Sequence, residues 1–276
     1  MLTVAVAGGS RPELLELVQH ARAELNEELV FKVFDTDSNI DDQGLWEYTP
    51  CQTEEESVQK TIACVVRKEA DIILKGGVKT HTLLKEVLKK EHGLKNKELL
   101  SHVALVNLPA LGRQILLTDS GMNIEPSEDQ LESIIENVME VGKKIGLTRP
   151  KIALLSAAEN FNPKMPSSVM AQALTETFKD QKEAIVHGPL SLDLALSKEA
   201  VKQKRYEGPI EGDADILVVP SIDTGNALYK SFILFGQATM GGTIVGTKVP
   251  IVLTSRSDAV KSKLHALKFA IMQANQ

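Results

Sequence analysis

Short runs of apolar residues, many of them β-branched, recur along this chain and alternate with longer amphipathic stretches. Most of these runs have no polar residue at every second position, so they predict strands that are buried on both faces of a sheet. The predicted strands span residues 2–7, 29–34, 72–74, 103–106, 115–118, 152–155, 184–186, 216–219, 244–245 and 251–253.

The amphipathic stretches carry apolar residues at helical spacing and predict helices. Examples are residues 12–25, 82–90, 128–145, 169–178 and 259–272. This alternation of strands and helices predicts an α/β fold with a mainly parallel sheet and right-handed crossovers.

A domain boundary is indicated near the middle of the chain. Residues 118–126 (TDSGMNIEP) are rich in turn formers, and they precede a long charged helix over residues 127–144. Thr148, Arg149 and Pro150 then end the helical pattern before a new strand. A chain of 276 residues is also long enough for about two domains. We therefore expect a first domain before this region and a second one after it.

Composition and charge restrict the kinds of partner. The formal net charge is -6, and aromatic residues make up only 4% of the chain. Nucleic-acid binding generally needs a basic face, and binding of single strands needs aromatic side chains on which bases stack. We therefore expect no nucleic-acid partner, although a local basic cleft can still attract a small anion.

The pattern gives no sign of secretion, a membrane span or a metal site. The start (MLTVAVAGGSRPELL) lacks a basic segment before an apolar core, and no run approaches about 18 apolar residues. Cys51 and Cys64 lack the spacing of metal ligands, and the histidines show no paired spacing. We expect two reduced structural thiols in a cytoplasmic protein without a bound metal.

Three strand ends carry candidate chemistry, because ligands of open α/β sheets bind beyond the carboxyl ends of the strands. The first is DIILKGGVKT (71–80), where a strand ends in Lys75 and Gly76 and Lys79 precedes a helix. Two lysines and two glycines at such a turn favour an anionic ligand, and a solvated turn explains them as well. The glycine pair after the first strand has the same two explanations, and it matches neither GxGxxG nor a Walker loop.

The second candidate follows the predicted strand 216–219. Gly225 supplies backbone freedom, and Asn226 or Thr224 can cap the next helix. Asp223 is either a second capping group or a ligand to the substrate.

The third candidate is the polar segment at the end of the last strand. Thr254, Ser255 and Arg256 stand where a helix start offers free N–H groups and a positive dipole end, and an arginine there can clamp phosphate. Ser255 and Asp258 also fit a capping box, so Asp258 can simply be a cap. Arg256 has no comparable structural explanation.

Taken together, these segments resemble the phosphate acetyl/butyryl transferase family. The resemblance is carried by ADILVVPSIDTGNALYKS (214–231) and GTKVPIVLTSRSDAVKSKL (246–264), and earlier segments agree in order. These are DIILKGGVKTHTLLKEVL (71–88), LLSHVALVNLP (99–109), LLTDSGMNIEPS (116–127), NPKMPSS (162–168) and HGPLSLDLALS (187–197). The NPKMP block, the short N-terminus and the TSR-x-D ending are more similar to the butyryl branch (phosphotransbutyrylase) than to the acetyl branch.

The resemblance implies a particular domain arrangement. It implies two domains of the three-layer α/β/α type with mainly parallel sheets, similar to isocitrate and isopropylmalate dehydrogenases, with the active site in the cleft between them. The first domain is expected to be discontinuous, with residues 1–125 and 253–276, and the second to span residues 126–252. A homodimer or higher homo-oligomer is also implied.

The same resemblance implies a reaction. Acyl-CoA and phosphate are converted reversibly into acyl phosphate and coenzyme A, with butyryl or branched short-chain acyl groups preferred. In the reverse direction the coenzyme A thiol or thiolate attacks the carbonyl of the acyl phosphate directly. Coenzyme A is then a substrate, and no metal or redox cofactor is implied.

The resemblance also assigns roles to residues. The family's Ser-Arg pair falls on Ser255 and Arg256, and a basic position on the helix after the Lys-Gly strand falls on Lys85. Ser262 stands where the acetyl branch has an aspartate proposed as the base for the thiol. The base is therefore left open among Asp258, Asp223 and no carboxylate.

Other functions remain as alternatives to a butyryl-type transferase. One is a phosphate acetyltransferase, and another is a non-catalytic module that binds coenzyme A or acyl phosphate on the same fold. A dehydrogenase of similar architecture is disfavoured, because the sequence has neither a dinucleotide fingerprint nor a metal-binding carboxylate cluster.

Overall fold

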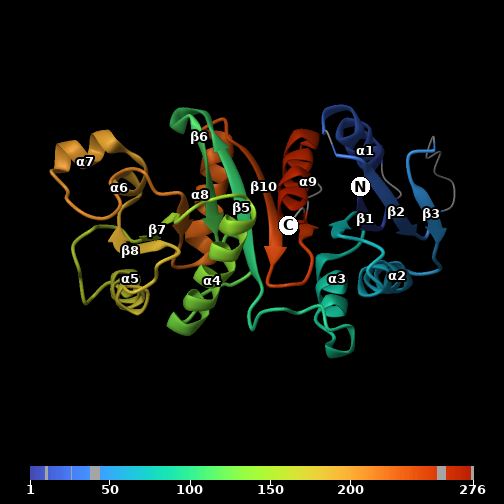
Figure 1. The fold of residues 1–276 in the computed structure, drawn as a ribbon, viewed down its shortest axis with the longest axis horizontal. Helices are drawn as coiled ribbons and strands as arrows, with labels where there is room; N and C mark the ends of the chain where they lie inside the picture. Colours follow the sequence, from blue (N-terminus) through green and yellow to red (C-terminus); the bar gives the residue numbers. More distant parts are fainter. Residues whose placement is uncertain (10–11, 26, 38–43, 254–258, 275–276) are drawn as a thin grey trace. The chain divides into compact units, whose positions relative to one another are not determined.

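The computed structural model of this chain describes residues 1–9, 12–25, 27–37, 44–253 and 259–274. The chain forms two compact units, and their helices and strands are labelled in Figure 1. Unit 1 comprises Met1–Glu98 and Gly241–Gln276, and unit 2 comprises Leu99–Met240. No described helix is long and apolar enough to cross a membrane.

The strands of unit 1 lie in the order β3-β2-β1-β4-β11-β10. All neighbouring pairs in this sheet are parallel except β10 and β11. The bounds are β1 Leu2–Ala7, β2 Leu29–Asp35, β3 Glu47–Pro50, β4 Ile72–Lys75, β10 Thr239–Val245 and β11 Ile251–Leu253.

Helices cover both faces of the unit 1 sheet (Figure 1). Val4 and Val6 of β1 belong to a core that includes the apolar sides of α1 (Pro12–Glu24) and α9 (Val260–Ala274). Successive strand residues point to opposite faces, so Ala5 and Ala7 face the layer of α2 and α3. This two-sided burial explains why the predicted strands lack polar alternation. The bounds of the other helices are α2 Glu54–Val66, α3 Thr80–Val87 and the short η1 Lys90–His92.

The strands of unit 2 lie in the order β5-β6-β9-β7-β8. Here β5 and β6 form an antiparallel pair, and the other neighbours are parallel. The bounds are β5 Ser101–Leu108, β6 Arg113–Thr118, β7 Lys151–Leu155, β8 Ile185–Leu190 and β9 Ile216–Val218. Leu194 of α6 and Phe232 of α8 pack on one face of this sheet, and α4 and α5 lie against the other. The helices are α4 Glu128–Lys144, α5 Pro166–Thr177, α6 Leu192–Leu196, α7 Lys198–Lys204, α8 Ile222–Leu234 and the short η2 Pro109–Leu111.

The α/β class with mainly parallel sheets and helices on both faces is confirmed. The chain passes from one unit to the other at residues 98/99 and 240/241. The boundaries expected from the sequence are different, at 125/126 and 252/253. The physical reason is strand pairing: β5 and β6 belong to the unit 2 sheet, and β10 pairs with β11 in unit 1.

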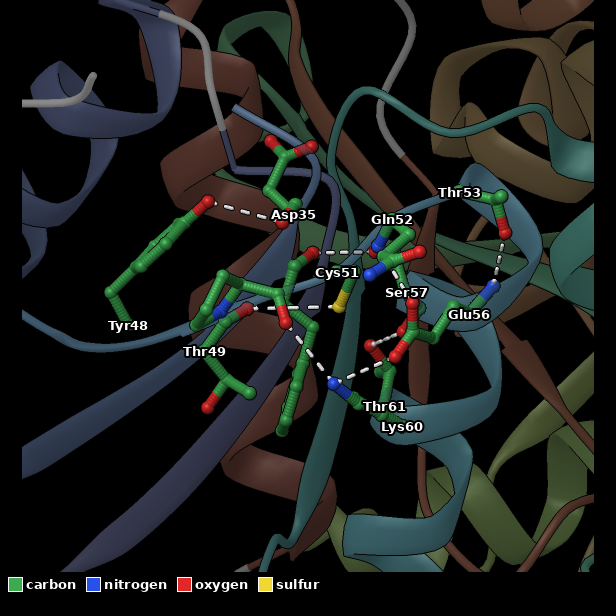
Figure 2. A network of polar contacts seen from close by, with 12 residues as sticks. Asp35, Tyr48, Thr49, Cys51, Gln52, Thr53, Glu56, Ser57, Lys60 and Thr61 are labelled. Carbon is green, nitrogen blue, oxygen red and sulfur yellow. Dashed lines mark hydrogen bonds and ion pairs between the residues drawn. The ribbon is translucent and has the colours of Figure 1, made fainter. Parts of the chain in front are cut away.

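Hydrogen bonds tie the start of α2 to the ends of β2 and β3 (Figure 2). Thr53 caps the helix by accepting a bond from the backbone N–H of Glu56 at 3.1 Å. The Lys60 ammonium donates to the Pro50 carbonyl at 3.1 Å, and the Cys51 N–H donates to the Asp35 carbonyl at 2.7 Å. Cys51 is thus held in a turn between strand and helix.

The two cysteines are unpaired and buried. Burial raises the pKa of both thiols, which keeps them protonated and unreactive at neutral pH. The expected pair of structural thiols without a disulfide is confirmed.

Candidate active site

In unit 1 the carboxyl ends of three parallel strands lie at one edge of the sheet. Ala7 of β1 pairs in register with Lys75 of β4, and Lys75 pairs with Leu253 of β11. The predicted site residues Thr254, Ser255, Arg256 and Asp258 follow β11 in the sequence and lie outside the described residues. At this edge of unit 1, the structure therefore describes the turns that follow β1 and β4.

Two glycine turns at this edge pack directly against each other. Gly8 has a positive φ of 77°, and its carbonyl accepts a bond from the N–H of Gly77 at 2.6 Å. A Cβ atom on Gly76 would lie 1.8 Å from the same Gly8 carbonyl oxygen. Close approach of two backbones thus explains these glycines without a ligand, and it fixes the shape of the edge.

The Lys75 side chain turns into this edge and is buried. Its ammonium donates to the carbonyls of Gly76 at 3.2 Å and of Val78 at 3.1 Å. Lysine is rarely buried without such partners, because desolvating its charge is costly. Lys75 therefore closes the turn before α3 and places positive charge beneath it.

The start of α3 already holds an anion from within the chain. A carboxylate oxygen of Glu54, in the first turn of α2, accepts a bond from the N–H of Lys79 at 3.1 Å. Burial alone would raise the pKa of Glu54, but bonds from Lys79 and Thr82 and the charges of Lys79 and Lys75 lower it below its usual value. The predicted anion preference of this helix start is thus satisfied by Glu54 in the structure.

The other two predicted lysines of this region face solvent. Lys79 is the N-cap residue of α3 and makes no side-chain cap bond, and Lys85 lies in the last turn of the same helix. Both side chains are exposed. The structure therefore brings Lys75, Gly76 and Lys79 together at one turn and puts Lys85 on the surface of the helix that follows.

In unit 2 the predicted helix after β9 starts one residue past Ser221. Ser221 is the N-cap, and its hydroxyl accepts a bond from the N–H of Thr224 at 3.4 Å. The prediction that Asn226 or Thr224 caps this helix is therefore wrong, because both already lie inside it. Asp223 and Asn226 are exposed on the first turns of α8.

Gly225 has a packing role that sequence reasoning did not specify. A Cβ atom at this position would lie 2.5 Å from the Asp119 carbonyl oxygen and 2.8 Å from the Cα of Ser120. The first turn of α8 therefore lies directly on the turn that follows β6.

That turn contains a polar cluster which the sequence analysis missed as a site. The buried carboxylate of Asp119 accepts bonds from the N–H groups of Gly121 at 2.8 Å, Met122 at 2.9 Å and His102 at 3.1 Å, and from the Asn123 amide at 2.6 Å. The segment TDSG was interpreted only as a turn, since the partner His102 is distant in sequence. These four bonds satisfy the buried carboxylate and fix the turn against which Gly225 of α8 packs.

The imidazole of His102 completes this cluster. Its Nδ1 lies 3.0 Å from the Ser120 hydroxyl, and its ring meets that of Tyr229 edge-on at 6.5 Å between centroids. Burial lowers the pKa of His102, and the nearby Asp119 charge only partly opposes this effect. The ring is therefore held neutral at pH 7.

One group among the described residues has the composition of a metal site. Glu86, Glu91 and His92 place ligand atoms within 4.8 Å of one another. Glu86 already pairs with Lys89 at 2.9 Å and with His92 at 2.8 Å, so ion pairing accounts for the cluster.

Each unit thus presents ligand-binding residue types at the carboxyl edge of a mainly parallel sheet, which is the site position of α/β enzymes that act on small molecules. The family model described as phosphate acetyl/butaryl transferase matches residues 45–271. The chain belongs to this family of acyltransferases.

Three similar proteins support the assignment. A probable phosphate butyryltransferase from Bacillus subtilis is 39% identical over 281 residues, which cover 99% of this chain and 94% of the relative. A phosphate acetyltransferase from Thermotoga maritima is 36% identical, with 80% of this chain and 76% of the relative covered. The crystal structure of a branched-chain phosphotransacylase from Enterococcus faecalis V583 covers 100% of both chains at 60% identity and a TM-score of 0.98.

Proposed function

We propose that this protein transfers short, preferentially branched or four-carbon, acyl groups between coenzyme A and inorganic phosphate. The proposal is carried by the 60% identity, over the whole chain, to the branched-chain phosphotransacylase. The similarity to a probable phosphate butyryltransferase at 39% identity supports it. The similarity to a phosphate acetyltransferase makes a preference for acetyl groups the second candidate for this protein.

The reaction needs no oxidant or reductant. A phosphate oxygen attacks the thioester carbonyl, a C–O bond forms, the C–S bond breaks and coenzyme A leaves as the thiolate. In the reverse direction the thiolate sulfur attacks the acyl phosphate carbonyl, and phosphate leaves as a stable anion. A free thiol has a pKa near 8.5, so a carboxylate that takes its proton raises the reactive fraction at pH 7.

We assign the reacting groups to the segment after β11. Arg256 clamps the phosphate through its planar guanidinium, and the hydroxyl of Ser255 with Thr254 donates to the carbonyl oxygen as negative charge develops there. A single donor of this kind contributes about 3 kcal/mol to transition-state stabilisation. Asp258 is the candidate base for the thiol, with Asp223 as the alternative.

We assign coenzyme A binding to the other residues of the predicted site. Lys79, the N-cap residue of α3, and Lys85 in the last turn of this helix are exposed cations, suited to the phosphates of coenzyme A. Lys75 and Gly76 shape the turn before them. Gly225 and Asn226 belong to the start of α8 in unit 2.

The remaining features of the proposal concern the whole protein. We propose a homo-oligomer without a bound metal or redox cofactor, in which units 1 and 2 act as two domains. The unpaired thiols Cys51 and Cys64 suit the reducing cytoplasm, where we expect the reaction.

The proposal is tested by release of free thiol from isobutyryl-, butyryl- and acetyl-CoA, with and without phosphate. Replacement of Arg256 by alanine should lower kcat/KM for phosphate by roughly 10- to 150-fold, since a bond to a charged group contributes about 1.5–3 kcal/mol. Arg67→Ala is the matched control, because Arg67 forms an exposed ion pair with Glu69.

Two outcomes would contradict the proposal. Thiol release that is unchanged when phosphate is omitted would remove phosphate as the acceptor. Equal kinetics of the Arg256 and Arg67 variants would remove Arg256 from the site.

A further inference from the structure

Unit 2 contains a pocket of about 350 Å³ to which the proposed mechanism gives no role. It opens beyond the carboxyl ends of β7 and β9, which pair in parallel with Leu154 opposite Val218. Leu155 at the end of β7, Pro220 after β9, Leu228 of α8 and Leu192 of α6 are its larger apolar lining residues. Its position relative to the strands is the one that ligand sites take in α/β folds.

The chemistry of the lining selects an uncharged ligand. Among the described residues that line the pocket, none carries a charge, and the polar side chains are the hydroxyls of Ser156, Ser167 and Thr224. The Ser156 hydroxyl lies 2.9 Å from that of Ser167, and the Thr224 hydroxyl lies 3.2 Å from that of Ser221. Because each of these hydroxyls already has a hydroxyl partner, a polar guest would compete with existing hydrogen bonds.

These properties exclude the charged parts of the substrates. Inorganic phosphate and the phosphates of coenzyme A would lose hydration here without gaining a cation. A short hydrocarbon chain has no charge to desolvate. Its binding free energy improves by about 0.8 kcal/mol, or roughly fourfold in affinity, for each methylene removed from water.

We infer that this pocket receives the acyl chain of the acyl-CoA and that Ala157, Leu192 and Leu228 set which chain length and branching it accepts. The inference rests on the proposed acyltransferase function and adds to it the residues that choose the acyl group. An acetyl group would leave most of the volume to water, whereas a butyryl or branched chain fills more of it.

Two lining residues allow opposite changes in size. Ala157 is exposed at the edge of the pocket, so a larger side chain there narrows the pocket without disturbing the core. Leu228 lies on the pocket-facing side of α8 and is only partly buried, so truncation to alanine widens the pocket.

The experiment measures kcat/KM for acetyl-, butyryl-, isovaleryl- and hexanoyl-CoA at saturating phosphate. In Ala157→Leu the kcat/KM ratio of butyryl-CoA to acetyl-CoA should fall at least tenfold. A pocket that accommodates one methylene more or less changes the discrimination between substrates by about 10- to 200-fold. In Leu228→Ala the ratio of hexanoyl-CoA to butyryl-CoA should rise by a similar factor. Calorimetric affinities for the same acyl-CoAs without phosphate should change in the same directions.

Two control positions lie on α8, the helix of Leu228, and are not among the residues that line the pocket. Ala227→Leu adds the same side chain at an exposed position, and Leu234→Ala removes one that is 70% exposed. Neither should change the ratios by more than about twofold, since surface changes are generally within about 0.5 kcal/mol.

The outcomes separate this inference from the proposed function. Pocket variants that change kcat/KM by the same factor for every acyl-CoA, and so leave the ratios unchanged, would overturn the acyl pocket but not the proposed reaction. A wild-type protein without phosphate-dependent release from any acyl-CoA would overturn the reaction. In that case, calorimetric selectivity for chain length that is lost in Ala157→Leu would still support the pocket, and its absence would overturn it.

Discussion

At the scale of single residues, the absence of a side chain at Gly76 controls the form of the candidate site. A Cβ atom there would lie 1.8 Å from the Gly8 carbonyl oxygen, a distance no relaxed structure tolerates. The sequence pattern alone left both a ligand contact and a structural turn open as explanations for these glycines. The distance favours the structural one, because the neighbouring backbone already fills the space.

Gly76→Ala is therefore expected to destabilise the protein by about 1–3 kcal/mol, since the two turns must separate to admit a methyl group. Gly142→Ala is the matched comparison in α4, where the nearest heavy atom to the added Cβ is 3.5 Å away. That change should stabilise the protein by about 0.5–1 kcal/mol, because alanine loses less backbone entropy in a helix. Urea unfolding measures both, and a Gly76 variant as stable as wild type would contradict the packing argument.

At the scale of elements, the strands were predicted more reliably than their pairing. Leu2–Ala7 and Ile251–Leu253 were predicted with their observed bounds, because both are buried on two faces and read as apolar runs. The strand Glu47–Pro50 was missed, since its sequence EYTP is polar and it pairs only along one edge. The antiparallel pairing of β5 with β6 also could not be read from apolar runs, which carry no direction.

The start of α3 shows a similar limit. Lysines and glycines at that turn predicted an anion, but no local pattern shows that Glu54 of another helix supplies one. The contact depends on how α2 and α3 pack, which is information that only the folded chain contains.

Glu54→Gln is expected to reduce the free energy of unfolding at pH 7 by about 0.3–1 kcal/mol, the usual contribution of a negative charge at a helix start. The pKa of Glu54 is lowered in the folded state, so its contribution is complete above the unfolded pKa near 4.3 and is lost as the pH falls below it. The difference from wild type should therefore shrink between pH 6 and pH 3.5 in urea titrations. Glu136→Gln, exposed in the middle of α4, is the control, and a difference that stays constant with pH would contradict the ionic role.

At the scale of the whole molecule, two histidines make stability depend on pH near neutrality. Burial lowers the pKa of both His102 and His187, and both belong to unit 2. The unfolded chain protonates each of them near pH 6.5, whereas the folded chain resists protonation. The unfolded state thus binds more protons as the pH falls, and stability falls with it.

His187→Gln should flatten this dependence between pH 7 and pH 5.5, by at most about 1.4 kcal/mol per pH unit. The Tyr206 hydroxyl lies 3.0 Å from Nε2 of His187, and the side-chain amide of a glutamine can make the same hydrogen bond without titrating. The control is Gln19→Asn on the surface of α1, which removes no titratable group and should leave the slope of unfolding free energy against pH unchanged. An unchanged slope in the His187 variant would show that this ring does not resist protonation.

The order of strands in unit 1 has a consequence for synthesis on the ribosome. β11 lies beside β4, yet β4 is made more than half a chain earlier, and all of unit 2 is translated between them. A nascent chain can close unit 2 while β4 still has one unpaired side, along Ile73, Leu74 and Lys75. Such an open strand can pair with other chains, so the emergence of β11 should end a period in which the nascent chain is prone to aggregate.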